Sequence, residues 1–119
     1  MFRLDFIANV VHTSKNSKGN YFMVGLADDK YNYKNYIIFQ KPIKLGKYDD
    51  PNAAINGTYI ECNGDICYNG CTKAILTKNK FSLIIKDTPI GIDISNVQIT
   101  DKFISYLKEI FGVVLIVDI

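Results

Sequence analysis

Apolar and polar residues alternate in short stretches along most of the chain, as they do in β-strands with one buried face. The first such stretch is "FRLDFIANVVH" (2–12), in which phenylalanine and leucine alternate with arginine and aspartate. Further strands are predicted where similar stretches lie between turn residues, at 21–27, 36–41, 58–62, 71–77, 80–86 and 92–99. The pattern therefore predicts a protein made mainly of strands.

Turn-forming residues separate the predicted strands. The segments "TSKNSKGN" (13–20) and "NGDICYNG" (63–70) contain glycine and asparagine, which tolerate positive φ, and the second holds two Asn-Gly pairs. The segment "DTPIG" (87–91) predicts another break. Residues 42–57 show no sustained period and are predicted to form a loop.

The period changes near the C-terminus. Between 101 and 111, apolar residues recur at the spacing of one helix face, and polar residues occupy the other face. Thr100 is a suitable N-cap and Gly112 a suitable stop, and "VVLIVDI" (113–119) predicts a closing strand. The predicted fold is a single α+β domain over 1–119. It consists of a mostly antiparallel sheet of about six to eight strands, with one C-terminal amphipathic helix (about 101–111) packed on it.

The composition fits this fold and excludes some functions. The 14 basic and 12 acidic side chains give a net charge of +2, which offers no electrostatic reason to expect binding to nucleic acid or to an anionic membrane. No stretch approaches the ~20 apolar residues of a membrane helix, and Asp5 and Asn9 interrupt the apolar N-terminal residues. The odd number of cysteines favours reduced thiols, so we expect a cytoplasmic protein.

Few residues suggest catalysis. The only histidine, His12, lies near the end of the first predicted strand, and nothing in the sequence places it beside a cysteine to form a nucleophilic pair. Asp28 and Asp29 are adjacent carboxylates, but neighbours on an extended chain point in opposite directions, and acidic residues are common in turns. Phosphate-binding and hydrolase motifs are absent from the sequence. We therefore expect no enzyme activity and no catalytic residues.

The cysteines are candidate metal ligands. Their spacing is Cys62-x4-Cys67-x3-Cys71, whereas structural zinc sites usually show closer cysteine pairs and a fourth ligand. If Cys62 and Cys71 lie on strands, they can enter the core as small apolar groups. A small zinc protein stays an alternative, but the expectation is that the chain uses no metal ligand and no cofactor.

Tyrosines gather in "YFMVGLADDKYNYKNYIIFQK" (21–41), next to Lys30 and Lys34. This combination is compatible with a stacking platform for single-stranded nucleic acid. The aspartates of the same segment, Asp28 and Asp29, would repel phosphate, and tyrosine is also favoured at protein interfaces. A third interpretation is that the tyrosines only cover the edge of the core. The sequence pattern leaves these three interpretations open and favours a protein partner over RNA.

The same segment carries a family resemblance. "FIANVV", followed by "GLADD" and "YIIFQ", resembles the immunity protein 10 family of bacterial polymorphic toxin systems. "TYIECNGDICYNGCTKAILTKNKFSLII" and "IDISNVQITDKFISYLKEIFG" are similar to the later segments of that family, in the same order, although 63–70 departs from the family's turn. The resemblance implies a non-enzymatic protein that binds and neutralises a cognate toxin encoded by a neighbouring gene.

The resemblance and the loop chemistry together give a set of candidate partner-binding residues. With a net charge of only +2, the chain either meets a toxin of moderate charge or uses a local acidic patch. No nucleic-acid or membrane partner is expected, and the chain is expected to be a monomer or a weak homodimer. The candidate residues are Asp28, Asp29, Tyr31, Tyr33, Glu61, Asp65 and Tyr68.

Overall fold

The computed structural model describes residues 5–50, 53 and 57–119. Its strands form two five-stranded sheets. Sheet A contains, in spatial order, β1 (Asp5–Ile7), β9 (Thr88–Asp93), β8 (Lys80–Ile85), β7 (Cys71–Thr77) and β10 (Leu115–Asp118). Sheet B contains, in spatial order, β2 (Val10–Asn16), β3 (Tyr21–Ala27), β4 (Tyr36–Pro42), β5 (Tyr59–Cys62) and β6 (Asp65–Tyr68).

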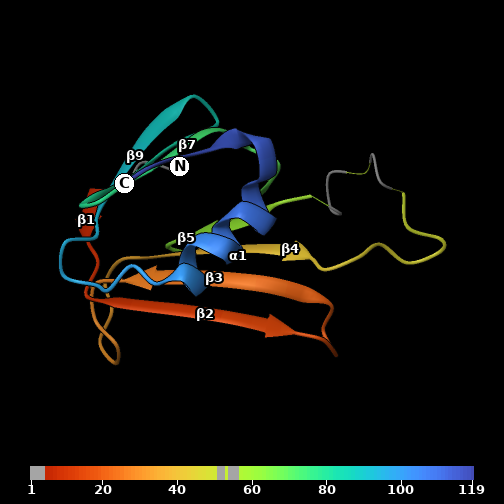
Figure 1. Cartoon of the computed structure of the whole chain (residues 1–119), viewed down its shortest axis with the longest axis horizontal. Coiled ribbons are helices and arrows are strands. Elements are labelled where there is room, and N and C mark those ends of the chain that lie inside the picture. Colours follow the sequence, from red (N-terminus) through yellow and green to blue (C-terminus); the bar gives the residue numbers. More distant parts are fainter. Residues whose placement is uncertain (1–4, 51–52, 54–56) are drawn as a thin grey trace.

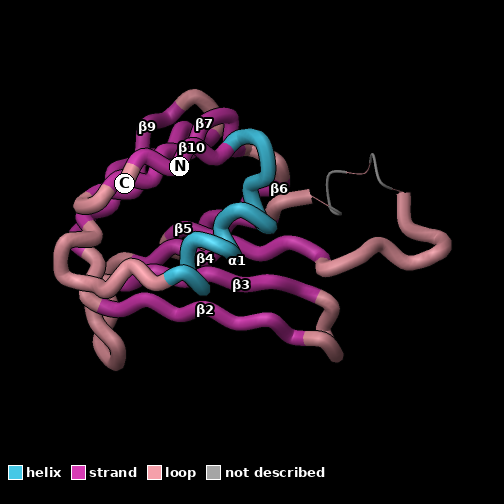
Figure 2. Tube along the Cα trace, viewed as in Figure 1, coloured by secondary structure: helices cyan, strands magenta, loops and turns pink. Residues whose placement is uncertain are grey.

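The two sheets face each other, and the helix α1 (Asp101–Phe111) lies between them at the front of the view (Figures 1 and 2). The helix contacts β2, β3 and β4 of sheet B, and a short 3-10 helix η2 (Gly112–Val114) leads from it into β10 of sheet A. Sheet B therefore has one face covered by α1 and sheet A, and one face that points away from them.

Three phenylalanines join the layers in the core. Phe39 from sheet B packs edge-on against Phe81 from sheet A, with ring centroids 5.8 Å apart, and against Phe111 from α1 at 5.0 Å. All three rings are buried, and such aromatic pairs stabilise a core beyond the area that they bury. The period-two pattern of the strands supplies the other buried side chains.

The α+β class is confirmed: most strand pairs are antiparallel, and a single helix lies near the C-terminus of the described residues. The helix bounds agree with the prediction. The Oγ1 of Thr100 accepts a hydrogen bond from the Phe103 N–H at 3.1 Å, and Gly112 has a φ of 58°. The prediction of one sheet with about six to eight strands is wrong, since the described residues form ten strands in two sheets.

The first predicted strand shows where the single-sheet prediction fails. Within 5–12 the chain changes sheets between adjacent residues: the Ala8 N–H donates to Asp93 in sheet A, and the Asn9 N–H donates to Ala27 in sheet B. The Asn9 side chain also donates to the backbone oxygen of Asp28. Residues 2–4 of that predicted strand lie outside the described residues.

Other boundaries also differ from the predicted ones. The strand β2 continues to Asn16, so the turn predicted over 13–20 is shorter. The turn in this region is made by Lys86 and Asp87, both with positive φ, so most of the predicted break at 87–91 is strand. The strand predicted over 92–99 ends at Asp93. Among the described residues, no helix is long and apolar enough to cross a membrane. Residues 51–52 and 54–56 of the predicted loop lie outside the description.

Candidate functional site

The outward face of sheet B carries a cluster of tyrosines around one carboxylate. Ile37 and Phe39 of β4 are fully buried, so the alternating residues of this strand point away from the core. The register places Ile38 opposite Glu61, and Tyr59 opposite Tyr68. We call this surface the tyrosine face and define it by Tyr33, Tyr36, Ile38, Tyr59, Glu61, Ile66 and Tyr68.

Glu61 is the centre of the tyrosine face. Its Oε2 accepts a hydrogen bond from the Tyr36 hydroxyl at 2.5 Å, and its Oε1 accepts one from the Tyr59 hydroxyl at 2.6 Å. These two bonds, the one from Tyr36 first, lower the pKa of Glu61. Conversely, the bond to Glu61 raises the pKa of Tyr36, and burial together with Glu61 raises the pKa of Tyr59 to about 12. The three side chains form a carboxylate with two neutral phenols at neutral pH.

Ring contacts extend this cluster on both sides. Tyr33 packs edge-on against Tyr36, with ring centroids 5.3 Å apart, and Tyr68 packs edge-on against Tyr59 at 5.5 Å. Tyr33 and Tyr68 keep 55% and 39% of their surface exposed, which leaves area for a partner to cover. The result is two tyrosine pairs, from a loop and three strands, that are joined through the carboxylate of Glu61.

The loop 28–35 is held by the side chain of Asp28. Its two carboxylate oxygens accept hydrogen bonds from the backbone N–H groups of Lys34 and Asn35, at 2.9 and 3.1 Å, and the Asn35 side chain adds a third. Partial burial raises the pKa of Asp28, but these bonds outweigh it and hold the pKa below its usual value. Asp28 therefore organises the loop that presents Tyr33.

Asp29 plays the same part at the tip of the loop. Its Oδ1 accepts bonds from the N–H groups of Tyr31 at 2.9 Å and Asn32 at 2.8 Å, and these bonds, Asn32 first, lower its pKa. The Tyr31 ring remains 86% exposed. In Figure 1 the loop projects from sheet B at the lower left, on the side away from α1. Both aspartates use their carboxylates within the loop, as turn chemistry predicts.

A groove of about 290 Å³ lies where the loop overhangs the sheet. Gly25 of β3 is on its floor, because a glycine leaves no side chain there, and Ile38 lies beside it. Its walls include His12, Tyr33, Tyr36 and Glu61, while Asp29 and Lys30 line the loop side. His12 is exposed in the middle of β2 rather than at the end of a strand, which corrects the sequence-based position.

The structure brings most of the predicted residues into one region. Tyr33, Glu61 and Tyr68 belong to the tyrosine face, and Asp28, Asp29 and Tyr31 belong to the adjoining loop. Asp65 lies exposed on β6 at the edge of sheet B. Tyr36 and Tyr59, which complete the cluster, were missed as binding candidates. The only sequence feature that pointed to these residues was the alternation of Tyr59 and Glu61 with apolar neighbours. The strand register that brings them to Tyr36 cannot be predicted from the sequence.

The cysteines lie in the core region rather than at a surface site. Cys62 and Cys67 are buried and Cys71 is half-buried, and all three are free thiols. Burial raises the pKa of Cys62 and of Cys71 to about 11, so both groups are protonated thiols at neutral pH. In the described part of the chain, no three histidine, cysteine or acidic side chains are grouped so that they could hold a metal ion.

Comparison with protein families gives a match to Immunity protein 10 over residues 7–100. This match covers most of the chain. The chain belongs to the immunity protein 10 family. A search of curated proteins finds no match.

The immunity protein 10 match contains every strand of sheet B, including the loop 28–35 and the whole tyrosine face. The helix α1 and the strand β10 follow it in the chain and lie outside the matched residues. The surface that the geometry singles out is thus part of the family domain.

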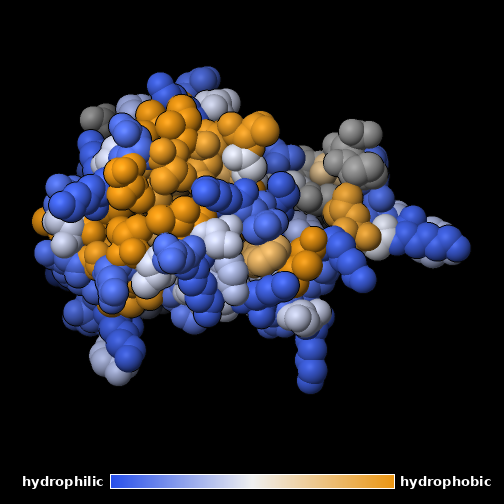
Figure 3. All heavy atoms as spheres, viewed as in Figure 1, coloured by the Kyte–Doolittle hydropathy of each residue, from blue (hydrophilic) through white to orange (hydrophobic). Residues whose placement is uncertain are grey.

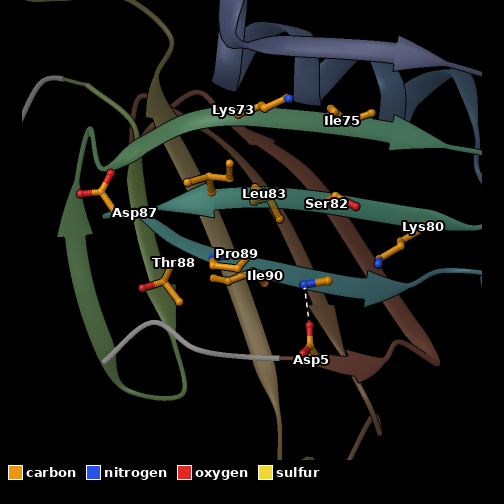
Figure 4. Close-up of a pocket in the computed structure, with 12 residues that line it drawn as sticks. Asp5, Lys73, Ile75, Lys80, Ser82, Leu83, Asp87, Thr88, Pro89 and Ile90 are labelled. Atoms are coloured by element: carbon orange, nitrogen blue, oxygen red, sulfur yellow. Dashed lines mark hydrogen bonds between the residues drawn. The ribbon is translucent and has the colours of Figure 1, made fainter.

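The outward face of sheet A offers a contrast within this immunity-family domain. It forms a groove of about 570 Å³ that includes Lys73, Ile75, Ile84 and Pro89. Figure 4 shows Lys73 and Lys80 at separate places along the strands, while Asp5 accepts a hydrogen bond from the Gly91 N–H at 2.8 Å. No aromatic side chain lines this groove among the described residues. The two ammonium groups, of Lys73 and Lys80, do not converge on a common point.

A second apolar surface lies where β10 meets the segment before α1. Ile119 is exposed there and lines one hollow with the half-buried Val97 and Ile104, while Ile116 and Val117 are exposed along β10. Figure 3 shows apolar atoms gathered on this side of the molecule. These side chains carry no polar group that could orient a partner.

Proposed function

We propose that this chain is a non-enzymatic inhibitor that binds and neutralises a cognate toxin, and that it does so through the tyrosine face and the loop 28–35. Membership of the immunity protein 10 family supports the role. The observation that carries the choice of surface is the Tyr36–Glu61–Tyr59 cluster, in which two phenols are held by one carboxylate on a solvent-facing sheet.

The cluster suits a protein interface because it is ordered before a partner arrives. A tyrosine offers a large contact area and loses little conformational freedom on binding, since only two torsions define its position. Here the hydroxyls of Tyr36 and Tyr59 are fixed by Glu61, and the rings of Tyr33 and Tyr68 are packed against them. Part of the entropic cost of binding is thereby met during folding.

The charge of this region fits a basic partner. The loop and the tyrosine face, together with the adjoining β6 strand, carry the carboxylates of Asp28, Asp29, Glu61 and Asp65, against the ammonium groups of Lys30 and Lys34. The region is acidic although the chain has a net charge of +2. Complementary charge would accelerate the encounter with a basic toxin and disfavour wrong partners.

Co-expression with the toxin encoded by the neighbouring gene tests the role. The chain is expected to restore growth of cells that make the toxin, and the two proteins are expected to co-purify as a 1:1 complex. Failure of rescue, with the chain expressed and folded, would contradict the proposed function.

The nucleic-acid alternative is weaker, because phosphate would meet the ionised Glu61 at the centre of the tyrosines. Binding to single-stranded RNA at low salt, measured by fluorescence anisotropy, is expected to be undetectable at micromolar protein. Tight and steeply salt-dependent binding would instead favour that alternative.

A further inference from the structure

We infer that the groove above Gly25 is a subsite for one basic side chain of the partner, an arginine or a lysine, held between the tyrosine rings and Glu61. The inference rests on the proposed function and adds to it the chemistry of the partner residue. The space, the hydrogen-bonding character and the charge of the groove each support it.

The space comes from Gly25. A Cβ built on this residue would meet only ordinary contacts: Met23 Cε is 3.8 Å away, and the Ile37 oxygen and Ile38 Cγ1 are each 3.9 Å away. No close approach of another chain segment therefore explains the glycine. A larger residue at this position would occupy the groove. The groove has a volume of about 290 Å³ and can hold one extended side chain.

The hydrogen-bonding character selects a donor. The hydroxyl hydrogen of Tyr36, which lines the groove, is directed to Glu61, so the outward lone pairs of this oxygen can only accept further hydrogen bonds. Glu61, ionised, is also an acceptor only. A partner group that brings several N–H donors can satisfy this surface, whereas a carboxylate, a phosphate or a carbonyl cannot.

The charge and the rings select a cation among the donors. Tyr33 and Tyr36 form an edge-on pair beside the groove, and aromatic faces attract ammonium and guanidinium groups. The carboxylates of Glu61 and Asp29 are also at the groove. Lys30 of this chain also lines the groove. Its Nζ lies 5.3 Å from the ring centroid of Tyr31, so its ammonium group is directed to that exposed ring. Guanidinium fits best, because it combines planar stacking with several fixed donors.

Titration of the isotope-labelled chain with two small probes tests the subsite. N-acetyl-arginine amide is expected to shift the amide resonances of Gly25, His12 and Tyr36 in a saturable manner. N-acetyl-citrulline amide has nearly the same shape without the charge, and it is expected to shift them at least fivefold less at equal concentration. Equal responses to the two probes, or no saturable response to arginine, would overturn the inference.

Three variants sharpen this test. Gly25→Val fills the groove on an outward strand position that tolerates a β-branched residue, so it should remove the arginine response while the fold is retained. Glu61→Gln should weaken the arginine response, because it removes the charge but keeps an acceptor. Lys30→Ala removes a competing positive charge and should strengthen it. An arginine response unchanged by both Gly25→Val and Glu61→Gln would place the probe elsewhere and overturn the inference.

Failure of the subsite and failure of the proposed function give different results. If the chain binds its toxin and Gly25→Val binds it equally well, the subsite is wrong and the toxin-binding role stands. If the chain does not bind the toxin while arginine still fills the groove, the role is wrong and the subsite chemistry stands.

Discussion

The two outward sheet faces of this molecule have the same number of strands and differ in how far their polar side chains are held in place. Each belongs to a five-stranded sheet, and each is hollowed by a groove. On sheet B the polar atoms of the tyrosine face bond to one another before any partner is present. On sheet A the cations Lys73 and Lys80 lie apart on long side chains, which lose much conformational freedom when a partner fixes them. The fixed positions of its side chains, rather than the volume of its groove, distinguish the proposed binding face from the face of sheet A.

The largest expected effect is a loss of stability when a side chain of the core between the two sheets is removed. Phe39→Ala deletes a fully buried ring that contacts Phe81 and Phe111, and it should lower the free energy of unfolding by about 3–5 kcal/mol. Urea denaturation followed by circular dichroism measures this. A loss below about 1 kcal/mol would show that the two sheets do not depend on this contact.

The next effect concerns the loop that adjoins only sheet B. Asp28→Ala removes the acceptor of the Lys34 and Asn35 amides, so these amides should exchange with solvent faster, and Tyr33 should lose its fixed position over Tyr36. Toxin affinity should fall by about tenfold, equivalent to about 1.4 kcal/mol, while amide exchange in sheet A stays the same. Unchanged exchange at both amides would contradict the role given to Asp28.

A smaller effect concerns the pH dependence of the tyrosine face. The pKa of Tyr59 is raised from 10.0 to about 12, so its contribution to stability is present below pH 10 and is lost as the pH rises towards 12. In Glu61→Gln the opposing negative charge is gone, so the pKa of Tyr59 should fall, although burial should keep it above 10. Carbon NMR of labelled tyrosine measures this pKa, and an unchanged value in the variant would contradict the link to Glu61.

Glu61 itself gives the complementary acid effect. Its pKa is lowered in the folded state, so its contribution to stability is present above the unfolded pKa, about 4.3, and is lost as the pH falls through the folded pKa. The stability difference between the chain and Glu61→Gln should therefore shrink between neutral pH and pH 3. A difference that grows on acidification, in urea denaturation at the two pH values, would oppose this assignment.

The smallest effect is expected for a control substitution of an exposed tyrosine outside the tyrosine face. Tyr48 is 92% exposed and lies in the loop after β4, away from the tyrosine face. Tyr48→Ala should change both stability and toxin affinity by less than about 0.5 kcal/mol. If this variant weakens toxin binding as much as a substitution in the tyrosine face does, any exposed tyrosine would contribute to affinity, whether or not hydrogen bonds hold it in a fixed position.

The sequence predicted the local elements better than their assembly. The helix over 101–111, with its cap at Thr100, follows from spacing and capping chemistry, which act within a few residues. The division into two sheets depends on the change of partner between Ala8 and Asn9, which long-range hydrogen bonds decide. A period of two identifies a buried face and does not say which sheet buries it.

The candidate site shows the same limit. The loop residues Asp28 to Tyr33 stand out by composition, and the role of the aspartates in the turn follows from their chemistry. The centre of the tyrosine face does not stand out in this way, because Tyr36 and Glu61 are 25 residues apart and meet only through the pairing of β4 with β5. A cluster formed by register is visible only in the folded chain.

One binding measurement compares the two faces directly. Isothermal titration calorimetry with the purified toxin of the neighbouring gene would compare Tyr33→Ala/Tyr68→Ala on sheet B with Lys73→Ala/Ile84→Ala on sheet A. The first pair is expected to lose at least about 100-fold in affinity, about 2.7 kcal/mol, and the second to stay within about twofold. An unchanged affinity in the tyrosine pair, or an equal loss in the sheet A pair, would contradict the claim that the tyrosine face is the binding surface.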